Sequence, residues 1–220
     1  MKRVVIIGLG IFGFNLSKEL FDHGFEVLAI DKNQDVVNRI RDYCSKAVIA
    51  DGREKDVLES LGIQPDDVVV ISFGEDLAAS TLVTLHLKEL AVKEIIVKVP
   101  NEDHQRILER VGATRVIIPE REMASRIARN LISPNVLDYL PVSEDFTICE
   151  VAPPSGFLGK SISDLRLREK FHIEVIAIRD VLSDRIQLVP EADFVIKDSD
   201  VLIVLGREEN IKKATDRPTR

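Results

Sequence analysis

The segment Gly8-Leu9-Gly10-Ile11-Phe12-Gly13 constrains the fold of this chain more strongly than any other feature of the sequence. It follows an apolar run at residues 4–7 and precedes an amphipathic run at residues 14–23. Glycines at this spacing permit a tight turn, let a phosphate approach the backbone, and let the helix pack closely on the sheet. The helix N-terminus then offers free N–H groups and a favourable dipole to the phosphate. The segment predicts a strand–turn–helix unit that binds a nucleotide.

Asp31 follows the next apolar run and is the expected acidic partner of the glycine segment. A carboxylate at the end of the second strand accepts hydrogen bonds from ribose hydroxyls and repels a 2′-phosphate, so we expect an adenine nucleotide other than NADP. A second interpretation stays open: the glycines only form a tight turn, and Asp31 caps the helix that follows it.

Short runs of β-branched residues alternate with longer amphipathic runs as far as residue 118. The short runs are continuously apolar, which is typical of strands covered on both faces. The alternation predicts an α/β fold with a Rossmann-like, doubly wound parallel sheet of strand order 3-2-1-4-5-6. The expected strands are residues 4–7, 27–30, 47–49, 68–72, 95–98 and 116–118. The expected helices are residues 14–23, 34–42, 54–61, 76–91 and 103–111.

The pattern changes after a further helical run at residues 121–132, which we expect to end at Ser133-Pro134 because proline disfavours its continuation. The remainder predicts a small α+β domain. Its expected elements are strands at residues 146–152, 173–179 and 201–205, a turn at 153–156, and a short helix within 160–171 that Ser163 caps. The expected domains are residues 1–133, which bind the nucleotide, 134–143 as crossover and hinge, 144–212 as the second domain, and 213–220 as a tail.

Further candidate ligands of the nucleotide follow the expected strands, where ligands of open α/β sheets bind. They are Lys32 after the second strand, Asp51 and Gly52 after the third, Phe73 and Gly74 after the fourth, and Lys98 at the end of the fifth. Lys98 can neutralise a phosphate, but an ordinary lysine surfacing at a strand end is an equally good interpretation. Glu120, after the sixth strand, is a candidate metal ligand, although a helix-capping carboxylate is the favoured interpretation.

Composition excludes several classes of function. The formal net charge of −7 argues against nucleic-acid binding, which usually needs a basic face. The two cysteines lie far apart and indicate free thiols in a reducing compartment, and the four histidines show no metal-ligand spacing. No apolar run approaches the roughly 20 residues that span a bilayer, and the start lacks a signal-peptide pattern. We therefore expect a cytoplasmic protein without membrane insertion.

Catalytic machinery is not evident in the sequence. A dehydrogenase needs an acid–base group that faces the nicotinamide, and the second half offers only His172, expected in an exposed loop. No phosphate-loop motif G-x-x-x-x-G-K-[ST] is present. The site therefore favours nucleotide sensing by a protein that is not an enzyme. Two alternatives remain: an NAD-dependent oxidoreductase, and a redox-sensing transcription regulator, which would usually carry a DNA-binding helix pair.

Several segments resemble a known family. "VVIIGLGIFGFNLSKELFDHGFEVLAID", "AVIADGREKDVLESLGI", "DLAASTLVTLHLKEL" and "GATRVIIPEREMASRIARNLISPNVLDYL" resemble the regulator-of-potassium-conductance (RCK) domain of TrkA/KtrA-type proteins. The tail, "FTICEVAPPSGFLGKSISDLRLREKFHIEVIAIRD" through "DSDVLIVLGREENI", resembles the companion C-terminal domain. The resemblance covers roughly residues 3–212 in the same order.

The resemblance implies a cytoplasmic gating subunit of a potassium transport system. Such proteins form ring-shaped homo-oligomers, in some cases with a sibling TrkA-type subunit. The ring docks on a TrkH/KtrB-like membrane potassium-translocating subunit, at the inner face of the plasma membrane. AMP, ADP, ATP or NAD(H) binds the Rossmann site and changes the shape of the ring.

The resemblance also assigns roles to individual residues. The glycines of the loop would hold phosphate and Asp31 the ribose, Asp51 would lie beside the adenosine, and Lys98 would reach phosphate. Glu120 matches an acid that in some relatives joins a divalent cation at the subunit interface. Ile11 is a departure, because ATP-responsive relatives often carry arginine at this position. This departure weakens the case for ATP and leaves AMP, ADP and NAD(H) open.

Overall fold

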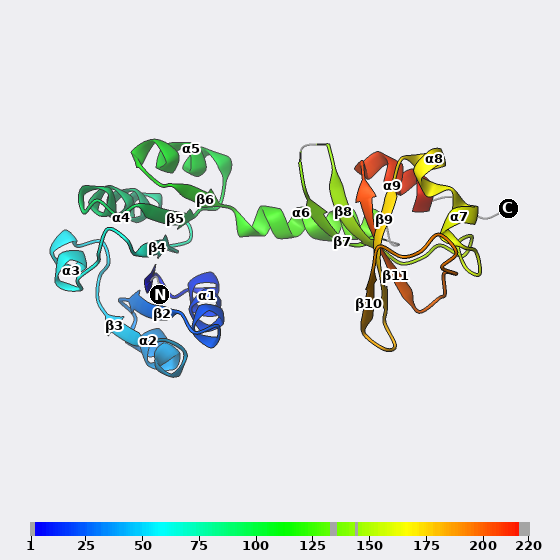
Figure 1. Cartoon of the computed structure of the whole chain (residues 1–220). Coiled ribbons are helices and arrows are strands. Elements are labelled where there is room, and N and C mark those ends of the chain that lie inside the picture. Colours follow the sequence, from blue (N-terminus) through cyan, green and yellow to red (C-terminus); the bar gives the residue numbers. More distant parts are fainter. Residues whose placement is uncertain (1–2, 133–135, 144, 216–220) are drawn as a thin grey trace. The chain divides into compact units, whose positions relative to one another are not determined.

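The computed structural model describes residues 3–132, 136–143 and 145–215 (Figure 1). The chain divides into two compact units, Met1–Glu122 and Met123–Arg220. The division falls inside helix α6 (Pro119–Ile132). The hinge at residues 134–143 stays a prediction, and the expected helix stop at Ser133-Pro134 lies outside the described residues.

The first unit contains a six-stranded parallel sheet of order β3-β2-β1-β4-β5-β6, which confirms the predicted Rossmann-like fold class. The order reverses between β1 and β4, and ligands of such sheets bind at the carboxyl ends of the strands at this point. The strands are β1 (Arg3–Ile7), β2 (Glu26–Asp31), β3 (Lys46–Ile49), β4 (Val68–Ile71), β5 (Glu94–Lys98) and β6 (Arg115–Ile117).

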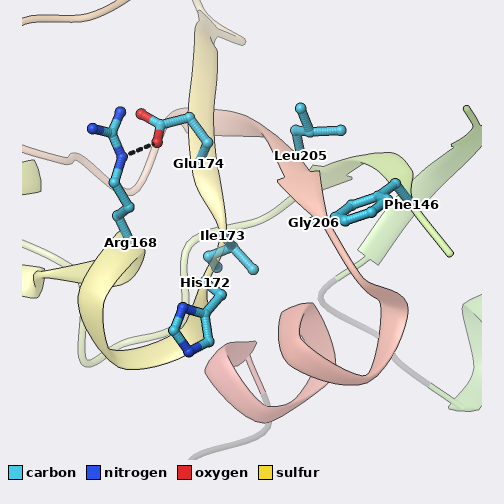
Figure 2. Close-up of a pocket in the computed structure, with 7 residues that line it drawn as sticks. All are labelled: Phe146, Arg168, His172, Ile173, Glu174, Leu205 and Gly206. Atoms are coloured by element: carbon cyan, nitrogen blue, oxygen red, sulfur yellow. Dashed lines mark hydrogen bonds and ion pairs between the residues drawn. The ribbon is translucent and has the colours of Figure 1, made fainter.

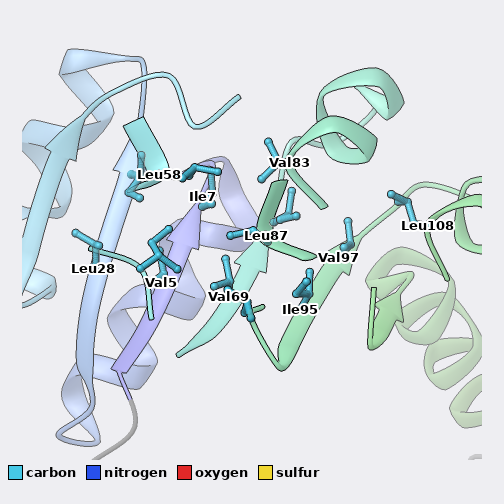
Figure 3. Close-up of a cluster of buried hydrophobic side chains, with 14 of the residues drawn as sticks. Val5, Ile7, Leu28, Leu58, Val69, Val83, Leu87, Ile95, Val97 and Leu108 are labelled. Atoms are coloured by element: carbon cyan, nitrogen blue, oxygen red, sulfur yellow. The ribbon is translucent and has the colours of Figure 1, made fainter. Parts of the chain in front are cut away.

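Helices cover both faces of this sheet, which explains why its strands are continuously apolar. Along β1, Val5 and Ile7 contact one core cluster, whereas Val4 and Ile6 contact the other. The first cluster includes buried side chains of α3, α4 and α5 (Figure 3), and the second includes side chains of α1 and α2. These helices are α1 (Ile11–Asp22), α2 (Gln34–Ile40), α3 (Lys55–Ser60), α4 (Leu77–Glu89) and α5 (Glu102–Val111).

The second unit is a small α+β domain, as predicted. Its five-stranded sheet is antiparallel and has the order β10-β9-β11-β8-β7. Buried side chains of α7, α8 and α9 share one core cluster with those of β7, β8, β9 and β11. The elements are β7 (Val136–Pro141), β8 (Thr147–Val151), α7 (Ile162–Leu165), α8 (Leu167–Phe171), β9 (Glu174–Asp180), β10 (Arg185–Leu188), β11 (Asp200–Gly206) and α9 (Glu208–Thr215).

The second unit also differs from the sequence-based expectation. Strands β7 and β10 and helix α9 were not predicted, and every residue of β10 is exposed, so no buried face marks it in the sequence. The expected cap Ser163 is wrong. Ser161 caps α7 instead, because its Oγ accepts the Asp164 N–H at 3.1 Å while the Asp164 carboxylate accepts the Ser161 N–H. Arg166, with φ of 48°, then separates α7 from α8, so the expected single helix is two helices.

Candidate functional site

The glycine segment forms a tight connection between β1 and α1. Gly8 has φ of +96°, a conformation that favours glycine, and a Cβ there would lie 2.6 Å from the Ser72 carbonyl oxygen at the end of β4. A Cβ on Gly13 would lie 2.0 Å from the Gly8 carbonyl oxygen. Both positions therefore exclude a side chain, because the start of α1 and the end of β4 each approach this loop at backbone contact distance.

Gly10 differs from these two glycines because the space around it is open. A Cβ on Gly10 would meet no atom within 4 Å, and the residue is exposed at the N-terminus of α1. The next residue, Ile11, is 88% exposed. A ligand can therefore approach the backbone at Gly10 without displacing protein atoms.

The first turn of α1 lacks the side-chain cap that three other helices of the first unit have. No described side chain caps α1, whereas Asn33, Asp76 and Asn101 accept backbone N–H groups at the starts of α2, α4 and α5. The first N–H groups of a helix have no partner within the helix. Those of α1 are therefore available to an anion such as a phosphate.

Asp31 links the glycine loop to the turn after β2. Its Oδ2 accepts the Leu9 N–H at 2.6 Å, and its Oδ1 accepts the Asn33 N–H at 2.8 Å. The interpretation that Asp31 caps the next helix is wrong, because Asn33 is the N-cap residue of α2. An ionised carboxylate has about four lone-pair sites, so Asp31 retains acceptor capacity for ribose hydroxyls.

The loops that follow β1, β3 and β4 meet at one edge of the sheet. A Cβ on Gly52 would lie 2.4 Å from Ile7 Cγ2, so the loop after β3 passes directly over the end of β1. The half-buried Phe73 ring lies beside Gly8 and Gly52, within 3.2 Å and 3.8 Å of the positions that their Cβ atoms would occupy. Gly74 follows with φ of +67°. The structure thus brings these predicted site residues together.

Asp51 is held by Arg53 at this edge. Arg53 donates from Nε to Oδ1 of Asp51 at 2.9 Å and from Nη2 to Oδ2 at 2.5 Å. These hydrogen bonds lower the pKa of the Asp51 carboxyl from 3.8 to about 2, against a smaller opposing effect of burial, and the charge of Lys32 contributes to the lowering. Asp51 is therefore an ionised acceptor throughout the physiological range. Arg53 was not predicted as a site residue, although a cation two positions after Asp51 was visible in the sequence.

Replacing Arg53 is expected to restore an ordinary acidity to Asp51. In the wild-type protein the pKa is depressed, so the contribution of the ionised carboxylate to stability is lost only as the pH falls from 3.8 toward about 2. In Arg53→Gln we expect the pKa of Asp51 to rise from about 2 toward 3.8, while the backbone N–H of residue 53 and the charge of Lys32 still favour the ionised form. An NMR titration of the Asp51 carboxyl carbon measures this shift. An unchanged pKa in the variant would contradict the assignment of Arg53 as the cause.

Lys98, at the end of β5, and Glu120, at the start of α6, form an ion pair. Lys98 Nζ lies 2.6 Å from Glu120 Oε1, and this contact lowers the pKa of the Glu120 carboxyl. Glu120 stands in the first turn of α6, where a negative charge also interacts favourably with the helix dipole. The described residues contain no cluster of three or more metal-binding side chains at Glu120 or elsewhere.

Phe12 and Lys32, the remaining predicted site residues, have different surroundings. The Phe12 side chain is half-buried and packs against the core cluster between α1, α2 and the sheet. The Lys32 side chain is exposed. Sequence reasoning missed the Leu9 amide and Asn33, whose roles depend on contacts with Asp31 and not on residue type alone.

A cavity of about 280 Å³ lies in the second unit (Figure 2). Arg168 and Glu174 form an ion pair beside it, and His172 ends α8 with φ of 53°. His172 is exposed, as expected. The cavity is lined by Phe146, Arg168, His172, Ile173, Glu174, Leu205 and Gly206.

Comparison with known families gives a match along almost the whole chain. Residues 4–119 match the TrkA-N domain, and residues 146–218 match the TrkA-C domain. The first match alone covers more than half of the chain. The chain belongs to the TrkA family. This finding confirms the resemblance that the sequence segments indicated.

Individual relatives of this TrkA-family chain are potassium uptake proteins by name. It is 40% identical over 216 residues to Ktr system potassium uptake protein C of Bacillus subtilis (strain 168), a match that covers 98% of this chain and 97% of the relative. It is also 40% identical over 212 residues to Ktr system potassium uptake protein A of the same organism, covering 96% of this chain and 95% of the relative.

Solved structures show the same fold. The RCK domain of GsuK superposes with a TM-score of 0.65 at 16% sequence identity, and the match covers 100% of this TrkA-family chain and 48% of the GsuK chain. The GsuK channel bound to NAD gives a TM-score of 0.64 at 16% identity, covering 100% of this chain and 40% of that chain. Among the described residues, no helix has both the length and the apolar character of a membrane-spanning segment.

Proposed function

We propose that this chain is a nucleotide-sensing regulatory subunit of a potassium transport system. The observation that carries the proposal is the open N-terminus of α1 beside Gly10, together with the Asp31 carboxylate that is bonded to Leu9. This geometry suits the phosphate and ribose of an adenine nucleotide. The names of the potassium uptake relatives and the NAD-bound GsuK channel support the same function. They favour it over an oxidoreductase or a transcription regulator.

The proposed ligand is AMP, ADP, ATP or NAD(H). The amides at Gly10 and in the first turn of α1 hold its phosphates, and Asp31 accepts hydrogen bonds from its ribose. Asp51, kept ionised by Arg53, lies beside the adenosine, where a carboxylate accepts from the adenine amino group and repels a carbonyl oxygen. Lys98 contacts a phosphate, and Glu120 joins a divalent cation at a subunit interface. Ile11 supplies no charge for a terminal phosphate.

The proposed mechanism is ligand-dependent gating. The chain forms an oligomeric ring, mainly of identical copies, that docks on a membrane potassium-translocating subunit at the cytoplasmic face. A nucleotide shifts the conformation of the ring only if it binds one conformation more tightly, and coupling of this kind is typically about 1–3 kcal/mol. Native mass spectrometry would give the number of subunits and bound nucleotides. Potassium flux in vesicles that contain the membrane subunit would test the gating.

The nucleotide preference gives the sharpest test of the site. We expect the wild-type protein to bind NAD at least about tenfold more tightly than NADP, because Asp31 repels the 2′-phosphate; a tenfold ratio corresponds to about 1.4 kcal/mol. Asp31→Asn keeps an oxygen for the Leu9 N–H but removes the charge, so this ratio should fall toward one. Isothermal titration calorimetry measures both affinities.

Asp35→Asn is the matched control for the preference test, because Asp35 lies in the first turn of α2 and is exposed. Asp35→Asn removes one negative charge, as Asp31→Asn does, and should leave the ratio of the NAD and NADP affinities unchanged. Absence of binding by any adenine nucleotide, or an equal ratio in Asp31→Asn and the wild type, would refute the proposed site.

A further inference from the structure

The Lys98–Glu120 ion pair joins two groups with unequal need for a partner. The Lys98 side chain is 16% exposed, whereas the Glu120 side chain is 66% exposed. Leaving a mostly buried ammonium without an anion is costly, whereas water readily solvates an exposed carboxylate. Lys98 therefore requires an anionic partner, but that partner need not be Glu120.

The position of Lys98 makes a phosphate the natural competitor. Lys98 ends β5, which is paired with β4, and β4 is paired with β1, whose end begins the glycine loop. All these strands are parallel, so their carboxyl ends lie at the same edge of the sheet. A phosphate at this edge can carry more negative charge than a carboxylate and offers several acceptor oxygens.

We propose that Glu120 and a phosphate group of the bound nucleotide compete for Lys98. This inference rests on the proposed function and adds a regulatory step to it. When the phosphate pairs with Lys98, Glu120 is released to solvent and becomes a carboxylate that a divalent cation can take as a ligand. When Glu120 pairs with Lys98, nucleotide affinity is reduced by the free energy of that ion pair.

Replacement of Glu120 by a phosphate at Lys98 affects the start of α6, which follows β6 (Figure 1). Among the described residues, two ion pairs join the first turn of this helix to neighbouring elements: Glu120 pairs with Lys98 at the end of β5, and Arg121 pairs with Glu102 at the start of α5. The division between the compact units follows directly, after Glu122. Release of Glu120 removes one of these two ion pairs, so nucleotide binding loosens the first turn of the helix that continues into the second unit.

Glu120→Gln should therefore bind ADP more tightly than the wild type. In buffer with EDTA and no divalent cation, we expect a decrease of about three- to fivefold in the dissociation constant, the range that a partly exposed ion pair allows. Lys98→Met should raise the constant by roughly 10- to 100-fold, because a charge-assisted hydrogen bond to phosphate is lost. Isothermal titration calorimetry with ADP measures both changes.

Glu102→Gln is the matched control. The Glu102 side chain is also 66% exposed and pairs with the same turn of α6, but its partner is Arg121. It should leave ADP affinity unchanged. An equal increase in ADP affinity in Glu102→Gln and Glu120→Gln would show a general charge effect and overturn the proposed competition for Lys98. Unchanged or weaker ADP binding in Glu120→Gln would also overturn it.

Amide hydrogen exchange at the start of α6 provides a second readout. Lys98→Met should increase exchange in the first turns of α6, and saturating ADP should do the same in the wild type. Protection of these amides by ADP would overturn the proposed competition for Lys98 even if nucleotide binds as proposed. If the wild-type protein binds no adenine nucleotide, the proposed function itself fails, which is a separate result.

Discussion

Gly13→Ala is expected to destabilise the first unit by about 2 kcal/mol or more. The added Cβ would lie 2.0 Å from the Gly8 carbonyl oxygen, a backbone atom that cannot rotate away. Overpacking of this kind typically costs about 1–3 kcal/mol, and backbone contact places this site at the upper end. Alanine in a helix is favoured over glycine by about 1 kcal/mol, which offsets only part of the cost. Urea unfolding followed by circular dichroism measures the difference.

Gly10→Ala is the control for this substitution, because a Cβ on Gly10 would meet nothing within 4 Å. Its free energy of unfolding should fall by no more than about 1 kcal/mol, the preference for glycine over alanine at an N-cap. Under the proposed function it should nevertheless weaken nucleotide binding, since the methyl group occupies the approach to the helix N-terminus. If Gly13→Ala were as stable as Gly10→Ala, the close approach of α1 to the loop would be disproved.

Asp67→Ala is expected to cost about 3 kcal/mol of stability. The Asp67 side chain is 7% exposed, and its oxygens accept from Arg3 Nε at 3.1 Å, from Arg3 Nη2 at 2.5 Å and from the Gln64 N–H at 2.7 Å. Removing one partner of a buried pair typically costs about 3–5 kcal/mol, and the partial exposure of Arg3, 23%, places this pair at the lower end. Faster amide hydrogen exchange in β1 and β4 of the variant would assign the loss of stability to the first unit.

The neighbouring residue supplies the matched control for this pair. Asp66 pairs with Lys93, but the two side chains are 81% and 73% exposed. Exposed ion pairs contribute about 0–1 kcal/mol, so Asp66→Ala should change the free energy of unfolding by less than about 1 kcal/mol. Equal costs for Asp66→Ala and Asp67→Ala would show that burial does not set the strength of the Asp67 pair.

Much of the first unit was predictable because its signals are local. Continuous apolar strands, helical spacing and the glycine segment each depend on residues close together in the chain, and they correctly predicted the doubly wound fold and its strand order. The second unit was less predictable. Strand β10 has no buried face, β7 lies in the stretch expected to be a hinge, and the helix cap shifts from Ser163 to Ser161.

The sequence by itself determined the fold class, the family and the residues that stand at the carboxyl ends of the strands. Only the tertiary structure decided how those residues pair: Asp31 with the Leu9 amide, Lys98 with Glu120, and Phe73 beside Gly8 and Gly52. The physical reason is the length scale of each signal. A strand or helix pattern depends on residues that are close together in the chain. The contacts of the site join loops that are far apart in the chain and that the crossover connections of the sheet bring to one edge.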